Sequence, residues 1–270
     1  MNEDKLLNKE KKLDYVSANG ETFGEEKIIM IAGPCAVENK EQIFSAAIGV
    51  KQAGATFLRG GAFKPRTSPY SFQGMGIEGL KLLKNAADYA NLKVVSEVLS
   101  ISQLEEAIPY CDMIQVGSRN MQNFELLKAI GKSKVPVLLK RGFSATFGEW
   151  LYAAEYIMSE GNCKIILCER GIRSFDPTTR NVLDLSAIPV VKEKSKLPII
   201  IDPSHATGNK NYVEALSLAA VAAGADGLLI EVHPHPESAL SDKDQQLTIE
   251  EYKNLVTKAK RVALAVGRTI

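Results

Sequence analysis

Short apolar runs alternate with amphipathic segments along most of the chain. From Lys27 onward, each strand-length run of aliphatic and β-branched residues is followed by apolar positions at helical spacing. Strands that are buried on both faces of a parallel sheet have this composition. The predicted strands are 28–32, 56–59, 93–97, 113–116, 137–140, 164–168, 199–202 and 227–232.

The segments between these runs predict helices. The connection after the sixth strand differs, because residues 176–189 have a proline near each end and predict a long loop with one short helix. Strand–helix units of near-even spacing in about 250 residues predict an α/β fold, the (β/α)8 TIM barrel. A doubly wound open sheet is the alternative, but the even spacing favours closure. The predicted helices are 41–53, 78–90, 101–108, 123–130, 147–158, 212–223 and 249–266.

The start of the chain lacks this rhythm. Residues 1–26 are polar and rich in Lys and Glu. Asn19-Gly20 is a two-residue hairpin signal, so we expect a small hairpin that covers one end of the main domain, with a disordered tail as the alternative. The predicted organisation is an N-terminal extension, 1–26, followed by a catalytic barrel domain, 27–270.

Composition excludes several classes of protein. A formal net charge of +1 gives no case for binding nucleic acid or membrane, and no apolar run approaches the ~20 residues of a membrane span. The four cysteines are too sparse for a disulfide scaffold and predict reduced thiols in a cytoplasmic protein. We interpret Cys111, Cys163 and Cys168 as structural, since their positions scatter over the faces and ends of two predicted strands.

The residues at the carboxyl ends of the predicted strands are polar and mostly charged. In a barrel these ends converge on one face, and catalytic residues come from several of them. Arg offers bidentate forks for phosphate or carboxylate and Lys offers a point charge, so a neutral chain that gathers cations here is predicted to bind anions. The residues are Cys35, Arg59, Glu97, Arg119, Lys140 with Arg141, Glu169 with Arg170, Asp202 with His205, and Glu231 with His233.

Some of these residues form a candidate metal site. Cys35, His205 and either Glu231 or Asp242 offer sulfur, imidazole nitrogen and carboxylate oxygen. This mixture favours a divalent transition metal over magnesium or calcium. His233 is a rival ligand, because positions 231 and 233 point to the same side of a strand.

Lys140 allows a second chemistry. A lysine that ends a barrel strand can form a Schiff base with a carbonyl substrate. We favour a phosphate-binding role, because other cations are predicted to share its neighbourhood, namely Arg119, Arg141 and Arg170.

Five motifs together resemble the 3-deoxy-D-arabino-heptulosonate 7-phosphate (DAHP) synthases, in the compact group related to the 3-deoxy-octulosonate 8-phosphate synthases. The resemblance covers about residues 27–268. It implies a TIM barrel that condenses phosphoenolpyruvate with erythrose 4-phosphate, the first step of the shikimate pathway. The motifs are Ile31-Ala32-Gly33-Pro34-Cys35, Lys64-Pro65-Arg66-Thr67-Ser68, Leu139-Lys140-Arg141-Gly142, Asp202-Pro203-Ser204-His205 and Glu231-Val232-His233-Pro234.

The resemblance also implies a role for each site residue. The metal would be Mn, Fe, Zn or Co, acting as a Lewis acid, with Glu231 preferred over His233 as its ligand. Glu97 would be a water-mediated helper near the phosphoenolpyruvate phosphate. The implied metal ligands are Cys35, His205, Glu231 and Asp242; Arg59 and Lys64 would bind the phosphoenolpyruvate carboxylate, Arg119, Lys140 and Arg170 its phosphate, and Arg66 and Thr67 the sugar phosphate.

Further expectations concern regulation and the choice of aldose. Relatives often carry an N-terminal regulatory domain, and 26 residues are too few for one, so we expect no strong inhibition by phenylalanine, tyrosine or chorismate. The resemblance implies a homo-oligomer, a tetramer or dimer, and permits a separate regulatory partner such as a chorismate mutase.

Pro65 favours erythrose 4-phosphate over arabinose 5-phosphate, the substrate of the alternative octulosonate synthase. A non-catalytic phosphosugar-binding barrel is the other alternative.

Overall fold

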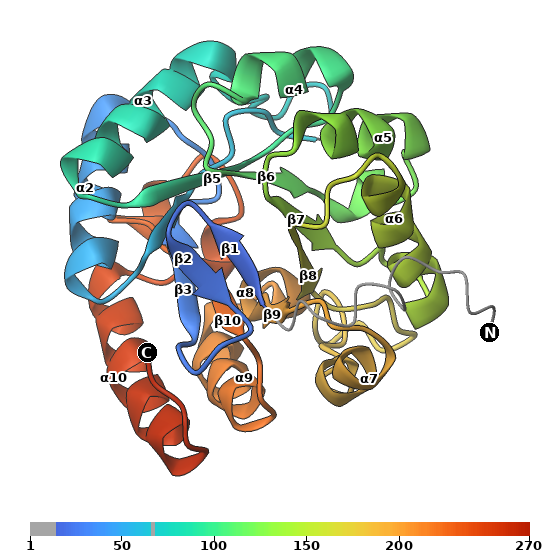
Figure 1. The fold of residues 1–270 in the computed structure, drawn as a ribbon. Helices are drawn as coiled ribbons and strands as arrows, with labels where there is room; N and C mark the ends of the chain where they lie inside the picture. The colour runs from blue at the N-terminus through green and yellow to red at the C-terminus, as the bar shows by residue number, and fades with distance from the viewer. Residues whose placement is uncertain (1–14, 66–67) are drawn as a thin grey trace.

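Residues 15–65 and 68–270 are described by the structure, a computed structural model. Eight parallel strands close into a barrel in the order β10-β3-β4-β5-β6-β7-β8-β9 (Figure 1). The barrel prediction is therefore confirmed and the open sheet is excluded. The strands are β3 Ile29–Gly33, β4 Phe57–Arg59, β5 Lys93–Glu97, β6 Met113–Val116, β7 Val137–Lys140, β8 Ile165–Glu169, β9 Ile199–Ile201 and β10 Gly227–Glu231.

Helices surround the barrel, and most match the predicted spans to within a few residues. The predicted long loop after β8 is present, and its helix α7 begins at Ala187 and continues past the predicted end of the segment to Lys194. Helix α8 was not predicted. It begins at Pro203, and Asp202 caps it by accepting a hydrogen bond from the His205 backbone N–H at 2.9 Å. The helices are α2 Lys40–Gln52, α3 Gly76–Tyr89, α4 Ile101–Ala107, α5 Phe124–Ser133, α6 Phe147–Ser159, α7 Ala187–Lys194, α8 Pro203–Thr207, α9 Lys210–Ala222 and α10 Ile249–Ala265, with short 3-10 turns η1 Ser118–Asn120, η2 Pro236–Ser238 and η3 Lys243–Gln245.

The two faces of each strand belong to two separate hydrophobic cores. Residues such as Met30 and Leu228 pack outward against the helices. Residues on the alternate positions, such as Ile31 and Leu229, fill the inside of the barrel. This period of two determines which side chain at each strand end points into the barrel mouth.

A small hairpin covers one end of the barrel. Strands β1 Val16–Ala18 and β2 Glu21–Phe23 pair antiparallel around Asn19-Gly20, both with positive φ, which the tight turn requires. The Phe23 ring packs 5.7 Å from the ring of Phe57 inside the barrel. The predicted hairpin is confirmed. The division of the chain at residue 26 stays a prediction, and residues 1–14 of the extension lie outside the described part.

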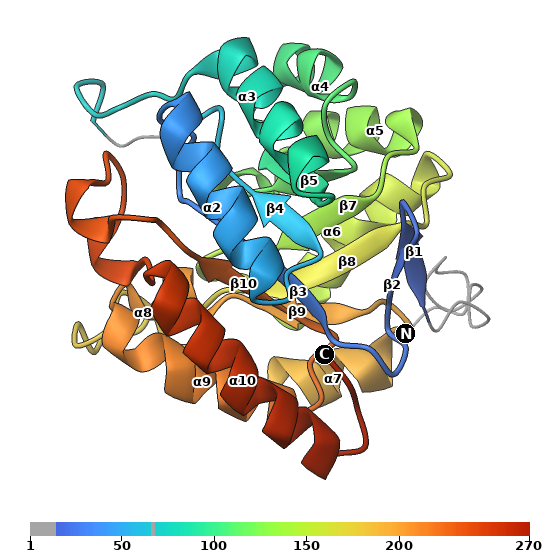
Figure 2. The ribbon, with the colours of Figure 1, turned by 90° about the vertical axis from the view of Figure 1, so that its left-hand side faces the viewer.

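Loops lie at the opposite end of the barrel. Viewed from the side, the hairpin lies at one end, while the loops after β4 and β10 extend from the other (Figure 2). The carboxyl ends of the strands face these loops. Within residues 15–65 and 68–270, no helix has the length and apolar character that crossing a bilayer requires.

Candidate active site

A pocket of about 300 Å³ opens among the loops at the carboxyl ends of the strands. Among the described residues, its lining includes six cationic side chains and only two carboxylates, with one imidazole. It is therefore strongly biased toward anions. The lining residues are Arg59, Lys64, Pro65, Ser68, Ser71, Glu97, Gly117, Ser118, Arg119, Lys140, Phe143, Arg170, Arg180, His205 and Asp242.

Strand alternation explains how these side chains reach the pocket. On β4, Phe57 fills the barrel interior and Arg59, two residues later, points the same way at the mouth. Lys140 follows Leu138 on β7 in the same manner. Six of the eight strands thus carry an interior apolar residue followed, two positions later, by a polar residue at the carboxyl end; the other such pairs are Val95 with Glu97, Cys168 with Arg170, Ile200 with Asp202, and Leu229 with Glu231.

Three of the four predicted metal ligands meet below one side of the pocket. The ligand atoms of Cys35, Glu231 and Asp242 all lie within 4.8 Å of one another. His205 lies beside them, with its Nε2 3.3 Å from Glu231 Oε1. We call these four residues the ligand cluster.

His205 is oriented by the carboxylate of Asp202. Its Nδ1 lies 2.7 Å from Asp202 Oδ2, which can accept a hydrogen bond from Nδ1, and its Nε2 faces Glu231 Oε1, where a bound cation would take its lone pair. Burial lowers the pKa of His205, which favours the neutral imidazole that metals bind. A carboxylate behind a histidine in this way is typical of metal sites.

The thiol of Cys35 sits among charges. Burial, together with Glu231, raises its pKa to about 12, and Lys64 opposes this with its Nζ 3.0 Å from Sγ. Two carboxylates within 4.8 Å of a buried thiol repel its ionised form. A divalent cation would reverse that balance, since a coordinating thiol is deprotonated outright. The donor set therefore fits a divalent transition metal.

The loop that carries Asp242 is held in an unusual conformation. Asp242 has φ 48° and ψ 43°, which non-glycine residues adopt at a cost, and its Oδ2 lies 3.3 Å from Cys35 Sγ. Glu38 ties this loop down by accepting from the Leu240 N–H at 2.9 Å. His233, the rival ligand, is occupied elsewhere: its Nε2 lies 3.4 Å from Glu38 and its Nδ1 accepts from the His235 N–H.

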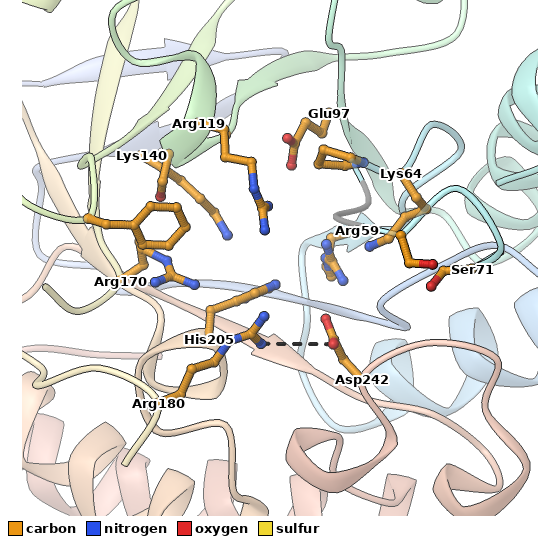
Figure 3. Close-up of a pocket in the computed structure, with 15 residues that line it drawn as sticks. Arg59, Lys64, Ser71, Glu97, Arg119, Lys140, Arg170, Arg180, His205 and Asp242 are labelled. Atoms are coloured by element: carbon orange, nitrogen blue, oxygen red, sulfur yellow. Dashed lines mark ion pairs between the residues drawn. The ribbon is translucent and has the colours of Figure 1, made fainter. Parts of the chain in front are cut away.

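Across the pocket, Arg119, Lys140 and Arg170 form what we call the cation wall. Their side chains point into the pocket from one side, facing Arg59 and Lys64 (Figure 3). Lys140 pairs with Asp202 at 2.6 Å. Within the part of the chain that the structure describes, Arg119 and Arg170 form no ion pair, so most of this positive charge faces the pocket.

Several buried polar atoms in the pocket have no partner. Among the described residues, four buried side-chain polar atoms lack a hydrogen bond, and three of them belong to pocket residues: Arg59 Nε, Ser118 Oγ and Arg170 Nη1. A buried unpaired donor costs about 1–3 kcal/mol. A bound anion would satisfy these donors.

Arg59 and Lys64 join the two sides of the pocket. Arg59 Nη1 donates to Glu231 Oε1 at 2.6 Å and to the Pro34 carbonyl at 2.7 Å. Lys64 Nζ donates to the Cys35 carbonyl at 2.8 Å. Both cations therefore contact the ligand cluster and still line the pocket.

Glu97 is the one lining carboxylate outside the ligand cluster among the described residues. Its Oε2 accepts a hydrogen bond from Gln115 Nε2 at 2.7 Å. A Cβ at Gly117 would lie 2.1 Å from Glu97 Oε1, so a larger residue there would displace the carboxylate from this position. Glu97 forms no ion pair with any residue in 15–65 or 68–270.

Not all sequence candidates reach the pocket. Arg66 and Thr67 lie outside the described residues. Arg141 follows the outward-facing Leu139, so it points away from the mouth and pairs with Glu169 at 3.0 Å and Asp184 at 2.9 Å. It does not share the neighbourhood of Lys140 as expected.

Five lining residues were missed: Ser71, Gly117, Ser118, Phe143 and Arg180. Arg180 lies in the loop after β8, where no periodic pattern marks it, and its Nη1 donates to Gln245 Oε1 at 3.0 Å. Phe143 follows β7 and gave no signal, because a single aromatic in a loop has no charge or spacing to distinguish it.

This geometry defines a class of protein: a barrel enzyme whose site joins an anion-binding wall to a mixed sulfur, nitrogen and oxygen ligand cluster. Residues 11–265 match the DAHP synthetase I family, and the chain belongs to that family.

The chain is similar in sequence to relatives with two different names. The chain is 52% identical over 245 residues to the phospho-2-dehydro-3-deoxyheptonate aldolase of Thermotoga maritima, covering 91% of this chain and 72% of that protein. It is 32% identical to the 2-dehydro-3-deoxyphosphooctonate aldolase of Syntrophotalea carbinolica, covering 92% and 96%. The crystal structure of the Thermotoga DAHP synthase superposes with a TM-score of 0.92 at 49% identity, covering 94% of this chain and 75% of that one.

Proposed function

We propose that the chain is a metal-dependent DAHP synthase, a transferase that condenses phosphoenolpyruvate with erythrose 4-phosphate and water to give DAHP and inorganic phosphate. The observation that carries this proposal is the opposition of two differently charged walls across one pocket. The cation wall suits a phosphorylated substrate, and the ligand cluster suits a metal that activates a carbonyl. The 52% identity to the Thermotoga heptonate aldolase supports the same conclusion.

The cations divide the binding of phosphoenolpyruvate between them. Arg119, Lys140 and Arg170 hold its phosphate, and the unpaired Arg170 Nη1 gains a partner when they do. Arg59 and Lys64 hold its carboxylate, beside the ligand cluster. Five cations thereby offset the repulsion between two phosphorylated substrates brought into contact.

The ligand cluster is proposed to hold a divalent transition metal through Cys35, His205, Glu231 and Asp242. A bound metal supplies Lewis-acid polarisation of the aldehyde oxygen. Two donors hold the carboxylate of Glu231, one on each oxygen. Arg59 Nη1 donates to Oε1, and Gln245 Nε2 donates to Oε2 at 2.6 Å. These contacts keep the donor atoms aimed inward.

The reaction then proceeds within the pocket. The methylene carbon of phosphoenolpyruvate attacks the aldehyde carbon and forms the new carbon–carbon bond. Water adds to the cationic C2, and the resulting hemiketal phosphate expels inorganic phosphate. Glu97 is proposed to hold that water, since it is a fixed carboxylate on the phosphate side of the pocket. Lys140 needs no Schiff base, because its Nζ pairs with Asp202.

The aldose is proposed to be held by the segment after β4, through Arg66 and Thr67. Pro65, in the pocket lining, offers no hydrogen-bond donor to a further sugar hydroxyl. A buried hydroxyl without a partner costs about 1–3 kcal/mol, roughly ten- to a hundredfold in rate. The preferred substrate is therefore erythrose 4-phosphate.

A phosphate-release assay tests this proposal. Phosphoenolpyruvate is supplied at saturation with either erythrose 4-phosphate or arabinose 5-phosphate, with and without a chelator. We expect kcat/KM to be at least about tenfold higher for erythrose 4-phosphate, with no release after chelation. Equal or reversed efficiencies would assign the chain to the octulosonate reaction. Absence of release with both sugars would leave a binding barrel.

A further inference from the structure

One aromatic ring stands among three guanidinium groups at the edge of the cation wall. The guanidinium carbons of Arg119, Arg170 and Arg173 lie 5.6, 4.7 and 5.3 Å from the ring centroid of Phe143. The three arginines come from η1, from the end of β8 and from the loop after β8. The same loop is tied to Phe143 by the backbone, since Arg173 N–H donates to the Phe143 carbonyl at 2.7 Å.

This arrangement holds like-charged side chains close together. Arg119 and Arg170 repel each other, and among the described residues neither has a carboxylate in ion-pair contact. A carboxylate would hold them, but it would also cancel the charge that a phosphate needs. The face of an aromatic ring attracts a cation through its quadrupole and adds no net charge. Phe143 can therefore hold the arginines and leave their charge available.

A second arginine–phenylalanine pair provides a contrast. Arg141 lies 4.3 Å from the ring centroid of Phe147, outside the pocket lining. Arg141 already pairs with Glu169 and Asp184 and donates to the Ala145 carbonyl. The ring of Phe147 is thus one of several supports for Arg141. Arg170, in contrast, has Nη1 buried without a hydrogen-bond partner.

We propose that Phe143 is a positioning residue for phosphate binding: its ring face spaces and orients Arg119 and Arg170 for a phosphate monoester, without neutralising them. This inference deepens the proposed function and rests on it, because the phosphate is taken to be that of phosphoenolpyruvate. Phe143 acts through the two arginines and need not touch the reacting atoms. Its removal should weaken phosphate binding at this wall specifically.

Calorimetric titration of chelator-treated protein tests the inference, with phosphoenolpyruvate and inorganic phosphate as separate probes. Phe143→Leu removes the ring face, Phe143→Tyr keeps it, and Phe147→Leu is the matched control at the other pair. We expect Phe143→Leu to weaken binding of both probes about tenfold, Phe143→Tyr to stay within about threefold of wild type, and Phe147→Leu to have no effect.

Steady-state kinetics give an independent readout. In Phe143→Leu the KM for phosphoenolpyruvate should rise about tenfold, while kcat and the KM for erythrose 4-phosphate stay within about twofold. Thermal unfolding of both leucine variants checks that each is folded. A purely structural role would move both KM values and kcat together, and would overturn the inference.

The outcomes separate this inference from the proposed function. Wild-type protein that binds neither probe would remove both. Wild-type protein that binds phosphoenolpyruvate, with Phe143→Leu binding it equally well, would overturn the role of Phe143 and leave the proposed function intact. Equal weakening in Phe147→Leu and Phe143→Leu would also overturn it, because the effect would then be general loss of packing.

Discussion

The ligand cluster and the cation wall face each other across one pocket, but their charged side chains are stabilised in different ways. In the ligand cluster, each acid is matched by a neighbour: Glu231 by Arg59 and Gln245, and the thiol of Cys35 by Lys64. Along the cation wall, Lys140 pairs with Asp202, whereas Arg119 and Arg170 lie against the ring of Phe143 and form no ion pair among the described residues.

The difference shows how each region is prepared for its ligand. Partners on every side fix the donor atoms of the ligand cluster, so they are held close together before a cation arrives. The cation wall keeps unpaired donors and uncompensated charge, which a substrate phosphate can satisfy. Lys140 connects the two, since it lines the pocket and pairs with Asp202, the carboxylate that orients His205.

The largest effect is expected in the ligand cluster. Cys35→Ser replaces a thiolate by a poor ligand, so metal affinity should fall by more than about a hundredfold, with turnover lost unless metal is in large excess. Metal competition with a chromophoric chelator measures this. Cys111→Ser is the control, because burial raises the pKa of Cys111 to about 12 as well, but Cys111 does not line the pocket. Equal metal affinity in wild type and Cys35→Ser would remove Cys35 from the cluster.

The next effect is expected at the cation wall. Arg170→Met should lower kcat/KM for phosphoenolpyruvate by about 10²–10³, because it removes a buried cation aimed at the phosphate. Metal affinity should not change, since among the described residues Arg170 forms no hydrogen bond or ion pair with a member of the ligand cluster. Kinetics and metal titration on one preparation measure both quantities. A variant that loses metal as well would show that the two regions are not separate.

Lys140→Met sharpens the comparison, because this lysine belongs to both regions. We expect phosphoenolpyruvate affinity to fall by roughly tenfold and metal affinity to fall by about tenfold, the second through the lost support of Asp202 and His205. The same two titrations apply. Loss of phosphoenolpyruvate affinity alone would mean that His205 is oriented without help from Lys140.

The smallest effect concerns an acid outside the pocket. Burial opposes ionisation of Asp184, but hydrogen bonds from Ser186 and Arg141 outweigh it and lower its pKa below 3.8. Since the folded-state pKa is the lower one, its stabilisation is present above the unfolded-state pKa of about 4 and is lost as the pH falls further, through the folded-state pKa. Asp184→Asn should cost about 0.5–1 kcal/mol of unfolding free energy at neutral pH and nothing in strong acid. Denaturant unfolding at both pH values measures it, and a pH-independent cost would contradict the assignment.

Much of this architecture could be predicted, because the pattern of apolar and polar residues along a strand depends only on neighbouring positions in the sequence. The runs ending at Arg59, Lys140 and Glu231 indicated both the barrel and the residues at its mouth. Side chains at successive positions of a strand point to opposite faces, so Lys140 and Arg141 cannot both point into the barrel mouth. The sequence prediction did not use this alternation and placed both residues at the same site.

The remainder depends on contacts between distant segments. Arg180 is held at the pocket by residues distant in sequence, such as Gln245, 65 residues later, which accepts a hydrogen bond from its guanidinium. Asp242 was indicated by its resemblance to the family motif, but its left-handed backbone follows from how the loop after β10 is anchored at Glu38. Neither contact has a periodic pattern in the sequence. Arg66 and Thr67 remain predictions.

The central claim is that substrate binding and metal binding are separate tasks of the two regions. The most direct measurement is a calorimetric titration of phosphoenolpyruvate into metal-loaded and chelator-treated wild type, paired with phosphate release on the same samples. The account predicts dissociation constants within about threefold of each other, because the cation wall is unchanged, while phosphate release disappears on chelation. Loss of phosphoenolpyruvate binding on chelation, or undiminished phosphate release without metal, would contradict it.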